Sequence, residues 1–106
     1  MSESVYPNID EISIHRLVPY YLMSSYLYYH QDKHVLDDGD YDKLCKRLLD
    51  NYKDIKHIHK RKVNRKALAA GTGYQININT FTTMIRSAAE SWYLDYEKEL
   101  KEKRNA

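Results

Sequence analysis

The chain has few of the residues that break or cross-link a fold: one cysteine, two prolines and three glycines in 106 residues. The lone Cys45 cannot form an intramolecular disulfide, which excludes a disulfide scaffold and fits a reducing compartment. Scarce glycine and proline predict long elements. No stretch approaches the roughly 18 consecutive apolar residues of a membrane span, and the N-terminus lacks the basic-then-apolar pattern of a signal peptide. We therefore expect a cytoplasmic protein without membrane contact.

Net charge is also low. At +2 it does not by itself indicate a nucleic-acid partner. The length and a hydrophobic content of 42% predict a single domain over residues 1–106. The aromatic residues are unevenly distributed, with eleven tyrosines against one phenylalanine and one tryptophan. Because tyrosine packs like an aromatic yet keeps a hydroxyl for a polar partner, this bias suits a thin core and a binding surface equally well.

The spacing of apolar residues predicts an all-α fold of three or four helices. Asp10 is a candidate cap for a first segment, Glu11 to Leu17. Proline is tolerated at a helix start and penalised in its interior, so Pro19 marks either a kink or a new helix from about Val18 to Gln31.

A well-patterned helix is expected after the acidic turn at Asp37–Asp40, whose carboxylates favour a cap. Its apolar positions recur at steps of three and four residues: Tyr41, Leu44, Cys45, Leu48, Leu49, Tyr52 and Ile55. The positions expected to face water are Lys43, Lys46, Arg47 and Asp50. The two helices would form a helix-turn-helix corner at about residues 20–55.

Residues 56–66 carry six Lys or Arg and two His without an acid. They lead into Gly71-Thr72-Gly73, which is expected to end a short helix in a loop through residue 79. A long last helix is predicted over residues 80–104, capped by Asn79 or Thr80, with a charged end that frays after Tyr96. We expect it to pack on the helix from Tyr41 through Phe81, Met84, Ile85, Ala88, Trp92, Tyr96 and Leu100.

Two clusters of tyrosine and aspartate flank the turn of the corner. Tyr28, Tyr29 and Tyr41 offer rings on which a planar heterocycle can stack. Asp38 and Asp42, four residues apart on one helix face, can accept hydrogen bonds from a ribose. The simpler interpretation is a capping turn with tyrosines that seal the helix junction. A metal site at the two carboxylates lacks clustered further ligands, and a hydrolytic centre lacks an evident nucleophile and base.

The same residues form a pattern of Tyr-Tyr, then Asp, two residues, Tyr-Asp and Leu. It comprises Tyr26-Leu27-Tyr28-Tyr29, Asp38, Tyr41-Asp42, Leu44 and Leu48-Leu49, within about residues 20–52. This third of the chain resembles the N-terminal helical subdomain of bacterial NAD-dependent DNA ligases, which clasps the nicotinamide mononucleotide (NMN) half of NAD. The resemblance implies that Tyr28 and Tyr41 stack on the nicotinamide ring, and that Asp38 and Asp42 contact the ribose and the ring amide. Tyr29 stands where some members have a histidine that contacts the phosphate.

The chain also departs from the ligase pattern. In the turn, Val35 and Asp37 replace a small residue and a proline of the family. The Lys-x-Asp-Gly element that supplies the adenylated lysine is absent, and the chain is too short for a nucleotidyltransferase domain. What remains resembles small ligase-related proteins of bacteriophages, in which the helical domain is followed by a segment like residues 68–74. We therefore expect a non-enzymatic, phage-encoded protein that binds a nicotinamide nucleotide such as NMN or NAD, or assists DNA metabolism.

Two other functions are compatible with the sequence. A tyrosine-rich surface could dock onto a host or phage protein, with the two clusters serving only to build the corner. Alternatively, the basic run could contact DNA or RNA phosphates through Lys60, Arg61, Lys62, Arg65 and Lys66.

Overall fold

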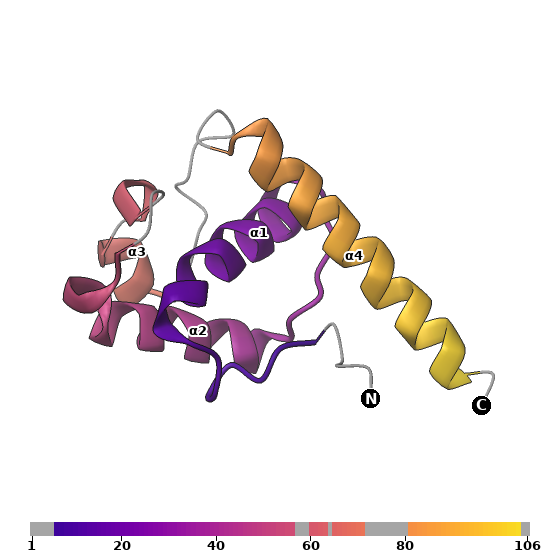
Figure 1. The fold of residues 1–106 in the computed structure, drawn as a ribbon, viewed down its shortest axis with the longest axis horizontal. Helices are drawn as coiled ribbons and strands as arrows, with labels where there is room; N and C mark the ends of the chain where they lie inside the picture. Colours follow the sequence, from indigo (N-terminus) through magenta and orange to yellow (C-terminus); the bar gives the residue numbers. More distant parts are fainter. Residues whose placement is uncertain (1–5, 57–59, 64, 72–80, 105–106) are drawn as a thin grey trace.

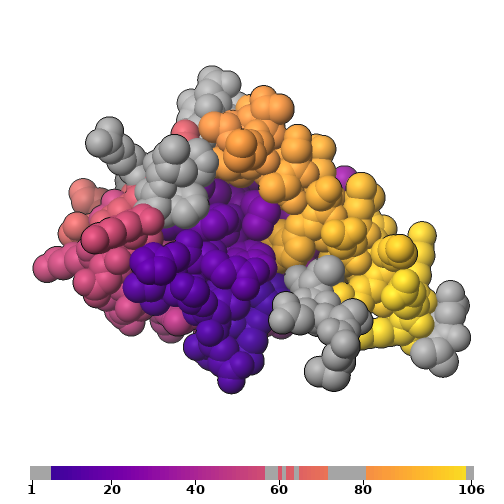
Figure 2. All heavy atoms as spheres, viewed as in Figure 1, coloured from indigo at the N-terminus to yellow at the C-terminus, as the bar shows by residue number. Residues whose placement is uncertain are grey.

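The computed structural model describes residues 6–56, 60–63, 65–71 and 81–104, and within them the fold is all-α, as predicted. Its helices are α1 (Leu17–His30), α2 (Asp38–Asp50), α3 (Arg65–Ala69) and the long α4 (Thr83–Arg104). Short 3-10 turns occupy Ile14–Arg16, Tyr52–Asp54 and Lys60–Lys62. Figures 1 and 2 show the C-terminal half of α4 extending past the body formed by α1 and α2. None of the described helices combines the length and apolarity needed to cross a membrane.

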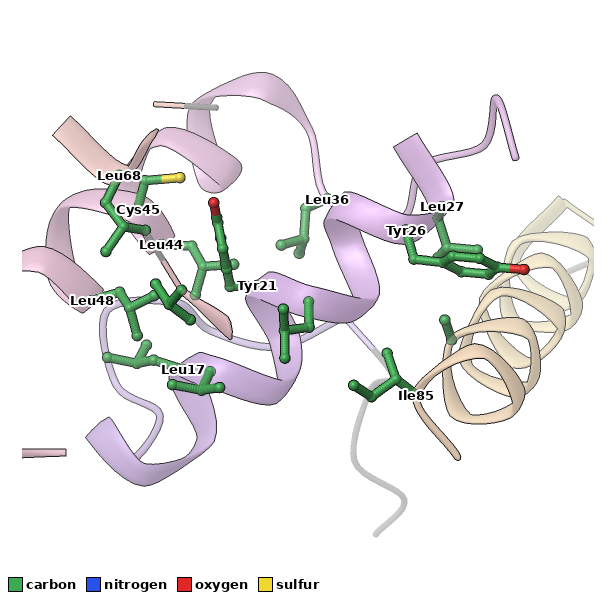
Figure 3. Close-up of a cluster of buried hydrophobic side chains, with 14 of the residues drawn as sticks. Leu17, Tyr21, Tyr26, Leu27, Leu36, Leu44, Cys45, Leu48, Leu68 and Ile85 are labelled. Carbon is green, nitrogen blue, oxygen red and sulfur yellow. The ribbon is translucent and has the colours of Figure 1, made fainter. Parts of the chain in front are cut away.

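The central helix is α1, which packs against α2 on one side and α4 on the other. Its buried residues therefore cover more than one face: Leu17, Val18, Tyr21, Leu22, Ser24, Ser25, Tyr26 and Leu27. Figure 3 shows Tyr21 on the side of Leu44 and Leu48 of α2, and Tyr26 on the side of Ile85 of α4. The core therefore has two parts, one between α1 and α2 and one between α1 and α4, and α1 contributes to both.

The helix predicted over Glu11 to Leu17 was wrong, because the structure has only a 3-10 turn at Ile14–Arg16 before α1 begins at Leu17. Ser13 accepts a hydrogen bond from the His15 amide and begins a 3-10 turn that leads directly into α1. Asp10 does not cap it; the Asp10 amide instead donates to Asn8 Oδ1 at 3.1 Å. Pro19 is the third residue of α1, where an amide hydrogen has no intrahelical acceptor, so the proline costs no helical hydrogen bond.

The predicted corner between α1 and α2 is present. Asp32 adopts a φ of 52° and the Lys33 amide donates to the Leu27 carbonyl at 2.9 Å, which turns the chain back after α1. Asp37 then caps α2, because its Oδ1 accepts from the Asp40 amide at 2.7 Å. The acidic turn therefore starts the helix as the sequence indicates.

The last helix packs on α1 and not on α2, so the predicted partner was wrong. The expected stripe is also displaced by one residue in places. Ile85, Ala89 and Trp92 are buried, whereas Met84 is 76% exposed and Ala88 faces solvent. These buried positions follow steps of four and three residues, which places them on one face of α4 against α1.

The start of α4 differs from the predicted residue 80, whereas its end at Arg104 is as predicted. The cap is Thr82, whose Oγ1 accepts from the Ile85 amide at 3.2 Å. The caps proposed from sequence, Asn79 and Thr80, lie outside the described residues. The helix continues beyond Tyr96 to Arg104, and a Glu99–Lys103 ion pair of 3.5 Å supports its last turns.

The segment before α1 is fastened to α2 by polar contacts. The Tyr6 hydroxyl donates to the Asp40 carboxylate and accepts from the Asp37 amide at 3.2 Å. Burial and the bond to Asp40 raise the pKa of Tyr6. Arg47 was expected to face water, but it is half-buried and donates to the carbonyls of Ile9, at 3.1 Å, and Ile12. The guanidinium therefore holds this segment against α2.

Candidate functional site

One cavity brings together all five residues that the sequence proposes for a nicotinamide nucleotide: Tyr28, Tyr29, Asp38, Tyr41 and Asp42. Its volume is about 280 Å³. This lies just below the range for small-molecule sites, about 300–1,000 Å³. The size suits an aromatic ring with an attached sugar better than a whole dinucleotide.

The corner itself positions these side chains. Tyr28 and Tyr29 lie in the last turn of α1, and the two aspartates and Tyr41 lie in the first turns of α2. Because the turn connecting the helices is short, the end of α1 meets the start of α2. The rings of Tyr28 and Tyr29 meet edge-on, with centroids 4.8 Å apart and planes at 73°. Tyr28 is 48% exposed and can therefore be reached from solvent.

Tyr41 is held much more firmly. Its hydroxyl shares a 2.8 Å hydrogen bond with Ser25, and its ring stacks on Tyr21 with centroids 6.1 Å apart. Burial raises the pKa of Tyr41 far above its ordinary value, so the phenol stays neutral. Tyr41 therefore provides a fixed wall of the cavity and also takes part in the packing between α1 and α2.

The two carboxylates give the cavity a negative rim. Asp38 and Asp42 are both exposed, and Asp42 pairs with Lys46 at 3.0 Å. Since that ion pair is exposed, water screens it and the charge of Asp42 stays available to a ligand. Two carboxylates beside three tyrosine rings favour a ligand that carries positive charge on a flat ring.

The other residues that line the cavity were not proposed from the sequence: Ser24, His34, Val35, Leu36 and Gly71. Ser24 could have been found, because it lies four residues before Tyr28 and shares its helix face. Gly71 comes from the end of α3, far along the chain. Its φ of 70° ends that helix, as the glycine pattern predicts, while Thr72 and Gly73 lie outside the described residues.

Replacing Gly71 by alanine is expected to lower the free energy of unfolding by about 1–2 kcal/mol. The positive φ disfavours a side chain, and an added Cβ would lie 3.0 Å from Oδ1 of Asp42. Gly39→Ala is the matched control: its Cβ would meet only Asp37 Oδ1 at an ordinary 3.5 Å, inside α2. That change should raise stability by up to about 1 kcal/mol. Urea denaturation measures both, and equal effects would contradict the strain at Gly71.

None of the described residues proposed for nucleic acid lines the cavity. Lys60 and Arg65 both lie over the ring of Tyr52, with the Lys60 ammonium and the Arg65 guanidinium each 4.5 Å from its centroid. Lys66 is exposed and Lys62 is half-buried. The side chain of Arg61 lies outside the described residues.

Metal and thiol chemistry find little support among the described residues. No three His, Cys, Asp or Glu side chains there are placed to hold a metal ion together. Cys45 is buried in α2, and burial raises the pKa of its thiol to about 12. The thiol is therefore protonated at neutral pH and is a poor nucleophile.

Comparison with known proteins finds no matching family model and no significant match among curated proteins or solved structures.

Proposed function

We propose that this chain is a non-catalytic, DNA ligase-related protein, encoded by a bacteriophage and acting in the host cytoplasm, that binds a nicotinamide nucleotide. The observation that carries the proposal is the convergence of Tyr28, Tyr29, Asp38, Tyr41 and Asp42 around one cavity. These residues were selected by their resemblance to the NMN-binding subdomain of NAD-dependent ligases. The ligand is NMN or the NMN half of NAD, and the protein supplies binding without adenylation.

The chemistry of the cavity suits this ligand. The oxidised nicotinamide ring is flat and cationic, so it is attracted both by tyrosine faces and by carboxylates. Tyr41 is fixed by Ser25 and Tyr21 before a ligand arrives, which reduces the entropy lost on binding. Exposed Asp38 and Asp42 can accept from ribose hydroxyls. The phosphate is best left in solvent, because the same carboxylates would repel it.

The distribution of tyrosines favours this proposal over docking onto a host or phage protein. Among the tyrosines that the structure describes, Tyr28 is the one that is exposed. Tyr21 and Tyr26 are buried, and the others are half-buried. A docking surface built from tyrosines would need several of them in the open. The described tyrosines instead build the core and the wall of the cavity.

Isothermal titration with NMN tests the proposed function. Asp38→Asn and Asp42→Asn are each expected to weaken binding about tenfold, since each removes a charged acceptor. Asp50→Asn, an equal change at the exposed far end of α2, should leave affinity unaltered. Reduced NMN, whose ring is neutral, should bind more weakly than the oxidised form. The proposal is contradicted if no heat of binding is detected at millimolar NMN, or if Tyr41→Ala and Asp42→Ala leave the affinity unchanged.

A further inference from the structure

The positive charge of this protein is concentrated in one short segment. Between residues 53 and 66 stand seven Lys or Arg and one acid, Asp54, which gives a formal charge of +6. The whole chain carries +2, so the remainder carries −4. The protein is therefore strongly dipolar, with its negative cavity and its positive segment on different parts of the chain.

Apolar residues fix this basic segment, residues 53–66, to the core. Ile55 is 1% exposed, Val63 is 5% exposed, and Leu68 follows at 1%. These anchors recur along the segment, and α3 packs on α2. In Figures 1 and 2 the described part of the segment forms the end of the molecule opposite the C-terminal end of α4. The cations between the anchors are thus carried by a folded scaffold and not by a free tail.

Tyr52 organises two of these cations. Both Lys60 and Arg65 lie at 4.5 Å from its ring centroid, although they are five residues apart in sequence. A ring face attracts a cation without neutralising its charge, unlike a carboxylate. Elsewhere, Lys43 and Lys46 are paired with Asp10 and Asp42. We call Tyr52, Lys60 and Arg65 the Tyr52 clamp, because the ring holds two charges together and leaves them available.

We propose that the Tyr52 clamp, together with Lys56 and Lys62, binds the phosphodiester backbone of a nucleic acid. Cations that are held near one another suit a polyanion with one phosphate per nucleotide. An arginine stacked on a ring also keeps N–H groups that can donate to phosphate oxygens. The proposed contacts go to phosphates alone, so binding should not depend on the base sequence. This inference goes beyond the nucleotide cavity and does not rest on it.

Fluorescence anisotropy with a labelled 20-nucleotide single strand and its duplex tests the proposal on the full chain. Binding is expected at 50 mM salt, with log K falling against log salt with a slope of about −2.8 for the single strand and about −3.6 for the duplex, as for roughly four neutralised phosphates. The double variant Lys60→Glu/Arg65→Glu should weaken binding at least about twentyfold. The control Lys98→Glu/Lys101→Glu makes the same charge change on exposed positions of α4 and should weaken it less than about threefold.

A second pair of variants distinguishes the effect of the Tyr52 ring from the effect of net charge. Tyr52→Phe keeps the ring and should bind like the native protein, whereas Tyr52→Leu releases both cations and should weaken binding several-fold at unchanged net charge. Circular dichroism and the thermal midpoint establish that each variant is folded. The proposal is overturned by no binding at 50 mM salt, or by equal losses in the clamp and α4 double variants. Equal binding to polyglutamate would also overturn it and point to an acidic protein partner.

Discussion

Replacing Leu44 by alanine is expected to lower the free energy of unfolding by about 3 kcal/mol and the thermal midpoint by more than about 10 °C. Leu44 is fully buried in α2, on the side that packs against α1, where Figure 3 shows it with Tyr21. Its loss removes apolar contacts and leaves a cavity that neighbouring side chains fill only in part. The effect is large because a chain of this size has one small core.

The same substitution at Leu94 is the control. Leu94 lies on α4 and is 65% exposed, so Leu94→Ala should change stability by less than about 0.5 kcal/mol. Urea denaturation followed by far-ultraviolet circular dichroism measures both variants. Equal losses at the two positions, or a loss below about 1 kcal/mol at Leu44, would show that the α1–α2 layer does not carry the core.

The corner was predictable because its determinants are local. Asp37 caps α2 by accepting from the amide of Asp40, only three residues further on, and the apolar period of α2 can be counted along the chain. Helices that are joined by a short turn must pack as neighbours. For the same reason the five cavity residues could be expected to lie near one another, since all of them stand within the corner.

Contacts between elements far apart in the sequence could not be predicted in the same way. Phe81, Ile85 and Trp92 are apolar whether α4 covers α1 or α2, and only the three-dimensional packing decides between the two. α1 could accept a second partner because its buried residues cover more than one face, which a search for a single stripe overlooks. Gly71 illustrates the same limit: its role as a helix stop is local, but its place beside Asp42 depends on how α3 packs on α2.

Arg47→Met is expected to lower the free energy of unfolding by about 2 kcal/mol, by releasing the segment before α1 from α2. The guanidinium donates to the carbonyls of Ile9 and Ile12, and a hydrogen bond that involves a charged group contributes about 1.5–3 kcal/mol. Because Arg47 is only half-buried, water replaces part of what the two carbonyls lose, and the net cost stays near the value of one such bond. Methionine keeps most of the apolar stem and removes only the N–H donors, so the loss of stability measures the contribution of the hydrogen bonds. The sequence hides this role, because Arg47 sits among lysines in a helix whose exposed positions are charged.

Native-state hydrogen exchange places the effect in the molecule. The amides of Glu11 and Ile12 both donate to the Asn8 carbonyl at 3.0 Å, and in Arg47→Met they should exchange about 30-fold faster, as a loss of 2 kcal/mol requires. Lys46→Met is the neighbouring control, because it loses only the exposed pair with Asp42 and should cost less than about 0.5 kcal/mol. Unchanged exchange at these two amides, with unchanged urea stability, would mean that Arg47 does not hold the segment. Its anchoring would then fall to Tyr6, whose hydroxyl contacts Asp37 and Asp40 at the capped end of α2, next to the cavity residue Asp38.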